Sequence, residues 1–131
     1  MKKIKIKYSV SLFFLLIFFV GCATKEPIKS SSAIVLFKTK NMNFYDQGFI
    51  NHFKSHISLQ VFEVGHQVLE LKVSPQRICR STFKCMHSKA FNAKFLHKSY
   101  EDDFLYQLLK KKKIYHKDKK NKIFIKVKYV K

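Results

Sequence analysis

Apolar residues along the chain change their spacing several times, and each spacing predicts a different element. An unbroken apolar run covers residues 12–20 and directly follows a lysine-rich start. Residues 33–37 are apolar and partly β-branched, and together with Lys38 they predict a strand over 33–38. Apolar and polar residues alternate over 57–73 on both sides of Gly65, where a positive φ costs little. This stretch therefore predicts a β-hairpin that turns near Gly65 and His66.

Helical spacing is confined to the second half of the domain. A short amphipathic helix is expected within 88–97, and the main helix is expected over 100–113 with Ser99 as its cap. The apolar stripe of the main helix consists of Phe104, Leu105, Leu108 and Leu109. The period-two pattern returns at 122–131 and predicts a closing strand.

Two stretches have no clear period. Residues 41–48 are rich in turn-forming types and predict a loop, while 49–56 fits either a strand or a short helical turn. A further loop is expected after Pro75, because proline cannot donate to a strand ladder. Taken together, the pattern predicts an α+β domain: a small antiparallel sheet of four to five strands with one main C-terminal helix packed on it.

Length and composition agree with one folded domain. The chain has 131 residues, and 47% of them are hydrophobic, which is enough to form a core and excludes extensive disorder. Only 3 Gly and 2 Pro are present, so collagen-like and low-complexity classes are excluded.

The N-terminal segment has the order of features of an exported protein. Lysines precede the apolar run of residues 12–20, which is long enough for a signal peptide but shorter than the roughly 20 residues of a membrane-spanning helix. The run ends abruptly at Gly21 and Cys22, and polar residues follow. The sequence Phe19-Val20-Gly21-Cys22 resembles the lipobox of bacterial lipoproteins, although Phe19 stands where that pattern prefers Leu.

This resemblance implies a lipid anchor and divides the chain into three parts. Signal cleavage would fall between Gly21 and Cys22, and Cys22 would be lipidated. Residues 1–21 are then the signal peptide, 22–32 a lipid-anchored flexible tether, and 33–131 the envelope domain. Two or more acyl chains anchor a protein stably in a bilayer. An ordinary cleavable signal and an uncleaved short anchor are the alternatives.

The resemblance also bears on location. Ala23 follows the cysteine, which in the best-studied sorting systems implies the outer membrane rather than the inner membrane. The part of the domain around residues 79–114 is similar to small lipoproteins from AT-rich bacterial genomes that have no assigned activity. The similar positions are Ile78, Cys79, Cys85, Phe91, Asn92, Phe95, Leu96, Tyr100, Leu108 and Leu109.

The chain is strongly basic, with 27 Lys and Arg against 8 Asp and Glu, a net charge of +19. Removal of residues 1–21 takes away four lysines and leaves a net charge of +15. Lysines concentrate in the C-terminal part, where Tyr115, Phe124 and Tyr129 are interleaved with them. This composition fits contact with an anionic envelope surface, or a lysine-biased proteome without a specific partner. Export makes cytosolic nucleic acid an unexpected partner.

Two cysteines remain if Cys22 is lipidated. Cys79 and Cys85 would then lie outside the reducing cytosol, where a disulfide persists, and we expect them to pair. A Cys2His2 metal site from Cys79, Cys85, His87 and either His66 or His97 is the alternative, but the spacing is not that of a standard zinc site. No metal or cofactor is therefore expected.

No catalytic motif is present, and no catalytic residues are expected. The sequence lacks a nucleophile elbow, a phosphate-binding loop and a dinucleotide fingerprint. His52 and His56 would align if their segment were helical, but the intervening residues are not those of a metalloprotease. The favoured function is a non-catalytic binding or scaffolding role within a larger envelope assembly. The alternative is an enzyme or metal-binding protein that uses the Cys79–His97 region.

Overall fold

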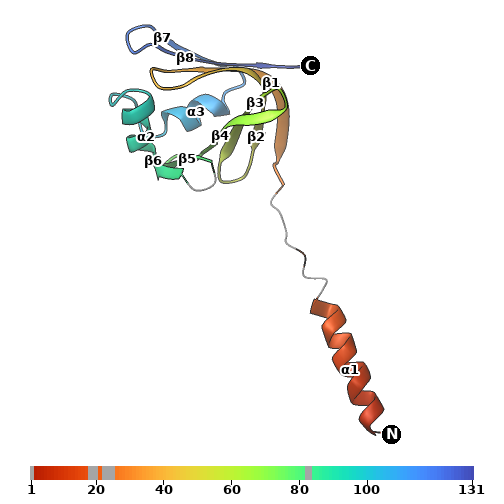
Figure 1. The fold of residues 1–131 in the computed structure, drawn as a ribbon. Helices are drawn as coiled ribbons and strands as arrows, with labels where there is room; N and C mark the ends of the chain where they lie inside the picture. The colour runs from red at the N-terminus through yellow and green to blue at the C-terminus, as the bar shows by residue number, and fades with distance from the viewer. Residues whose placement is uncertain (1, 18–20, 22–25, 82–83) are drawn as a thin grey trace.

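The computed structural model describes all residues of the chain except 1, 18–20, 22–25 and 82–83 (Figure 1). The N-terminal helix α1 covers Lys2–Ile17 and contains the first part of the apolar run. Among the described helices, none is both long and apolar enough to span a membrane. The end of the apolar run and the predicted lipidation site, Cys22, lie outside the described residues.

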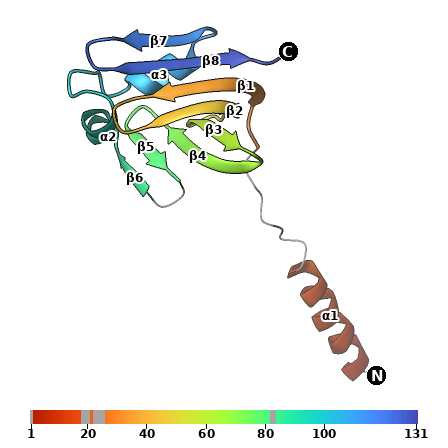
Figure 2. The ribbon, with the colours of Figure 1, turned by 45° about the horizontal axis from the view of Figure 1, so that its top comes forward.

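The described strands form one antiparallel sheet (Figures 1 and 2). Eight strands lie side by side in the order β6-β5-β4-β3-β2-β1-β8-β7. Their bounds are Lys29–Lys38 (β1), Asn43–His52 (β2), Ile57–Glu63 (β3), His66–Val73 (β4), Arg77–Arg80 (β5), Lys84–His87 (β6), Ile114–Asp118 (β7) and Ile123–Tyr129 (β8). Strands β1 to β6 follow one another as a meander, whereas β8 and β7 extend the sheet on the other side of β1.

Two short helices carry the chain from one edge of the sheet to the other. These are α2 (Ser88–Phe95), which follows β6, and α3 (Phe104–Lys110), which precedes β7. Both lie inside the curve of the sheet (Figure 1). The connection is long because β6 and β7 form opposite edges, so the helices must cross the whole sheet.

The two faces of the sheet differ because successive residues of a strand point to opposite sides. On the inner face, Val35, Phe37 and Ile125 are fully buried, and Phe91 of α2 and Leu105 of α3 complete the same core. The opposite face, which we call the outer face, carries neither α2 nor α3 (Figure 1).

The predicted fold class is wrong. Instead of four to five strands with one main C-terminal helix, the described chain has eight strands, and its domain helices are short. Strands β5 and β6 have four residues each and occupy the predicted Cys79–Cys85 loop. A strand of this length places only two residues on each face, which is too few to produce a recognisable alternation.

Strand β2 runs through the segment that its composition predicts as a loop. Gly48 is the informative residue: a Cβ there would lie 2.0 Å from the carbonyl oxygen of Gln60 and 3.1 Å from a methyl carbon of Val35. This glycine therefore permits close contact between β2 and β3, although its residue type also indicates a turn. The ambiguous stretch 49–56 divides into the end of β2 and the turn before β3.

The predicted hairpin over 57–73 is confirmed. It consists of β3 and β4, joined by Val64 and Gly65 with φ values of 49° and 78°. Positive φ at both central residues is the geometry that matches the right-handed twist of the paired strands. The predicted short helix within 88–97 and the closing strand are also present, as α2 and β8.

The predicted main helix over 100–113 is wrong in length, because only residues 104–110 are helical. Tertiary contacts act on both ends. At the start, the Glu101 carbonyl accepts a hydrogen bond of 2.7 Å from Nδ2 of Asn92, and the Ser99 hydroxyl contacts His97. At the end, Lys111 is extended, and Ile114 is buried where β7 begins.

Strand β1 begins at Lys29, so residues 29–32 of the predicted tether belong to the sheet. Ser32 pairs with Phe49 of β2, and Lys29 pairs with His52. Six residues, 23–28, then separate Cys22 from the first strand.

Candidate binding face

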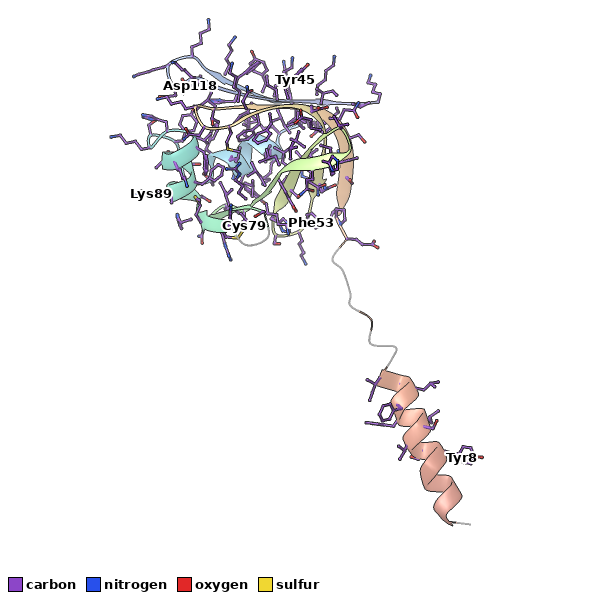
Figure 3. All side chains as sticks on the ribbon, in the orientation of Figure 1. Tyr8, Tyr45, Phe53, Cys79, Lys89 and Asp118 are labelled. Atoms are coloured by element: carbon purple, nitrogen blue, oxygen red, sulfur yellow. A yellow bond between two sulfur atoms is a disulfide. The ribbon has the colours of Figure 1, made fainter. Side chains whose placement is uncertain are left out.

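The outer face of β7, β8, β1 and β2 carries a row of aromatic, lysine and aliphatic side chains. Tyr115 pairs with Lys126, Lys126 with Leu36, and Leu36 with Tyr45, so the four side chains cross the four strands in that order. The aromatic residues at both ends are open to solvent, with 47% of Tyr115 and 71% of Tyr45 exposed. Figure 3 shows Tyr45 on the side of the sheet away from the helices.

A shallow groove of about 390 Å³ lies on this face. It is lined by Ile34, Leu36, Tyr45, Phe124, Lys126 and Lys128. Four of these side chains are aliphatic or aromatic, and both charged ones are lysines. The groove therefore has an apolar floor with positive charge beside it.

Local contacts hold the aromatic part of the groove in place. The rings of Tyr115 and Phe124 meet edge to face, with their centroids 5.5 Å apart. The ammonium of Lys117 lies 5.3 Å from the centroid of the Phe124 ring. Such contacts are favourable between an aromatic face and an edge or a cation. We define the binding face as the six groove residues together with Tyr115 and Lys117.

The three aromatic residues that are interleaved with the C-terminal lysines do not lie on one face of the sheet. Tyr115 and Phe124 lie on the outer face, whereas Tyr129 pairs with Ala33 and packs against the core. Lys110 lies at the end of α3. The basic C-terminal half is thus not one surface.

Sequence reasoning missed the contribution of β1 and β2 to this face. Ile34, Leu36 and Tyr45 are the residues concerned, and the pattern of residues 33–38 contains the relevant signal. This stretch is apolar at odd and even positions alike, so both faces of β1 are apolar, whereas a strand with one solvated face alternates. Tyr45 gives no such signal, because the segment around it, residues 41–48, is rich in turn-forming types.

Cys79 and Cys85 form a disulfide, as expected from the sequence. They face each other directly across β5 and β6, and their Cα atoms are 3.9 Å apart. Both sulfur atoms are used in this bond, so neither is a thiolate ligand for a metal. Figure 3 shows Cys79 at the part of the sheet remote from Tyr45.

The histidines of the alternative metal site make local contacts instead. Nδ1 of His87 accepts a hydrogen bond from the Lys89 amide and caps α2, and Nδ1 of His97 contacts the Ser99 hydroxyl. His52 ends β2, and His56 stacks on Phe53 in the following turn, so the helical alignment of the two does not form. Within the described residues, no group of three or more His, Cys, Asp or Glu side chains is placed to hold a metal ion.

A polar cluster lies where the α2–α3 connection meets β7. The Tyr100 hydroxyl donates to Oδ2 of Asp118 at 2.5 Å and lies 2.9 Å from Nε2 of His116. The hydrogen bonds from Tyr100 and Asn121 lower the pKa of Asp118 to about 2. Burial lowers the pKa of His116, with a contribution from Lys111 that Asp118 opposes, and burial raises the pKa of Tyr100. The shifts keep Asp118 charged and Tyr100 protonated, which suits a structural link between two segments.

Of the predicted cleavage residues, Gly21 is exposed and Cys22 is outside the described residues. The chain matches no protein family model, no curated protein and no solved structure. The residues and the geometry of the sites themselves therefore have to indicate what the protein does.

Proposed function

We propose that this chain is a lipid-anchored protein of the bacterial cell envelope, with the outer membrane as its location. Its domain acts without catalysis, as a binding subunit of a larger envelope assembly. The proposal of a lipid anchor is supported by the order of lysines, apolar run, Gly21 and Cys22 in the sequence.

The observation that carries the binding role is the binding face itself. An apolar floor with Tyr45 and Phe124 lies open on a sheet face that α2 and α3 leave uncovered. Aromatic residues are enriched in protein interfaces, and the rim around the buried centre is polar and accessible to solvent. The partner that fits this arrangement is a protein segment with an apolar side chain next to an acidic one.

The anchor is tested by growing the producing cells with a clickable fatty acid. We expect the mature protein to carry the label and to sediment with membranes, and we expect Cys22→Ser to lose both. A Cys22→Ser chain that is still labelled would show that Cys22 is not the anchor.

The binding role is tested with a photo-crosslinking amino acid at Tyr45 in the full chain, expressed in its own cells. We expect one adduct of constant mass, which disappears in the double variant Lys126→Glu and Lys128→Glu because these lysines flank the groove. The matched control places the crosslinker at Val64, which is 92% exposed in the β3–β4 turn. Equal adducts from both positions, or none from Tyr45, would contradict the proposal.

A further inference from the structure

We infer that the end of the sheet from which the tether leaves docks on anionic phospholipid head groups. Lys29, Lys110, Lys111 and Lys112 supply the charge of this second surface, which we call the lysine groove. The inference rests on the proposed lipid anchor and adds a specific membrane contact to it.

Segments that are distant in the sequence meet at the lysine groove. The groove has a volume of about 810 Å³ and is lined by the start of β1, the last residue of α3 with the two residues that follow it, and the end of β8 with Val130. The lining residues used in this argument are Ile28, Lys29, Lys110, Lys111, Lys112 and Val130. Figure 2 shows the start of β1 and the end of β8 at the same end of the sheet.

The charge of this groove is not balanced within the described chain. All four lysines are exposed, and no described carboxylate lies within the 4.0 Å ion-pair distance of their ammonium groups. The nearest acidic run in the sequence, residues 101–103, lies before the opposite end of α3. Lys110 also lies 5.3 Å from the Tyr106 ring centroid, which leaves its charge in place.

Exposed apolar residues accompany this charge. Ile28 is 75% exposed and Val130 is 55% exposed, and both line the groove. Lysines attract anionic lipid head groups, and apolar side chains beside them can enter the boundary between head groups and acyl chains. This combination favours a lipid surface over a soluble anion.

The short tether brings the lysine groove within reach of the bilayer. Lys29 is seven positions after Cys22, so even a fully extended chain separates the two residues by no more than about 25 Å. Electrostatic attraction to head groups acts within a Debye length, about 8–10 Å at ordinary salt. A domain held this close to the bilayer turns the start of β1, and with it the lysine groove, toward the membrane surface.

The lysines at the end of α3 also complement the negative end of the helix dipole. This stabilisation of α3 would be the same whatever lipids the vesicle contains. The test therefore compares lipid compositions rather than stability.

The experiment uses the full acylated chain, purified in detergent and reconstituted into vesicles of phosphatidylcholine alone or with phosphatidylglycerol. An amine-reactive label is added, and its rate at each lysine is read by mass spectrometry. With phosphatidylglycerol we expect labelling of Lys29 and Lys110–Lys112 to slow by about fivefold each, equivalent to about 1 kcal/mol per lysine at an anionic surface. High salt should restore the rate.

Matched controls separate the outcomes. Lys98, Lys119 and Lys120 are exposed lysines outside the lysine groove, and their labelling should be the same in both vesicles. The triple variant Lys110→Gln, Lys111→Gln and Lys112→Gln should lose the protection of Lys29, whereas the corresponding change at 98, 119 and 120 should keep it.

Equal labelling of the groove in both vesicles, or protection of the control lysines instead, would overturn the inference. Protection by free phosphate or by an oligonucleotide on phosphatidylcholine vesicles would also overturn it, because the groove would then bind anions in general. Failure of the chain to float with phosphatidylcholine vesicles would instead contradict the proposed lipid anchor.

Discussion

The hydroxyl of Tyr100 donates a hydrogen bond to the carboxylate of Asp118 and so joins the segment before α3 to the end of β7. Asn121 donates to the same carboxylate from its backbone amide and its side chain, at 3.1 and 2.7 Å. These bonds favour the charged form of Asp118. They also hold the chain segment between α2 and α3 against the end of β7.

Tyr100→Phe is expected to lower the free energy of unfolding at neutral pH, and this loss should shrink in acid. The bonds lower the pKa of Asp118 from 3.8 to about 2, so their contribution is complete above pH 3.8 and disappears as the pH falls through about 2. Urea unfolding of both proteins between neutral and acidic pH measures the difference. Tyr106→Phe is the control and should change stability equally at every pH. A Tyr100→Phe loss that does not depend on pH would contradict this link.

Gly48→Ala is expected to destabilise the sheet by about 3 kcal/mol or more, because the new methyl group overlaps the Gln60 carbonyl. Gly65→Ala is the matched comparison: its site has open space, and only its φ of 78° opposes a side chain, at about 1 kcal/mol. Thermal and urea unfolding of the two variants measures which of them loses more stability. Equal losses would mean that β2 and β3 do not approach as closely as the structure shows.

Val64→Asn is expected to raise the free energy of unfolding by about 1 kcal/mol. A β-branched residue is unfavourable at a φ of 49°, and Val64 is 92% exposed, so its replacement loses no buried contact. Asparagine before glycine is the preferred pair for this turn. Val68→Asn, at the unpaired residue of the β-bulge in the neighbouring strand, should not stabilise the protein, because Val68 has no positive φ to be relieved. Stabilisation by both changes would contradict the turn as its cause.

The double variant Cys79→Ser and Cys85→Ser is expected to lose about 2 kcal/mol of stability, the loop-entropy contribution of so short a ring. A reducing agent should lower the stability of the unmodified protein by a similar amount and leave the double variant unchanged. Unfolding curves with and without the reductant provide the measurement. An effect of the reductant on the double variant would show that it acts elsewhere.

Some parts of this structure follow from local pattern. The hairpin over 57–73 is readable because each of its strands is long enough to alternate, and Gly65 marks its turn. The closing strand can be predicted for the same reason. Helix α2 can be predicted from the helical spacing of its apolar residues. The sequence predicts the pairing of Cys79 with Cys85 because the lipobox resemblance leaves only these two cysteines.

The sheet size, the length of α3 and both candidate surfaces depend on contacts between distant segments. The alternation of apolar and polar residues predicts on which face of a strand a side chain lies, but it does not predict which strand is the neighbour. The sequence therefore predicts that Leu36 and Lys126 are strand residues, while only the pairing of β1 with β8 places them side by side in the groove. In the same way, Lys29 and Lys111 meet because β1 begins where α3 ends. The sequence by itself determined the hairpin, the closing strand and the excess of positive charge. The tertiary structure decided where that charge gathers, because strand pairing and chain crossing are set by the whole core.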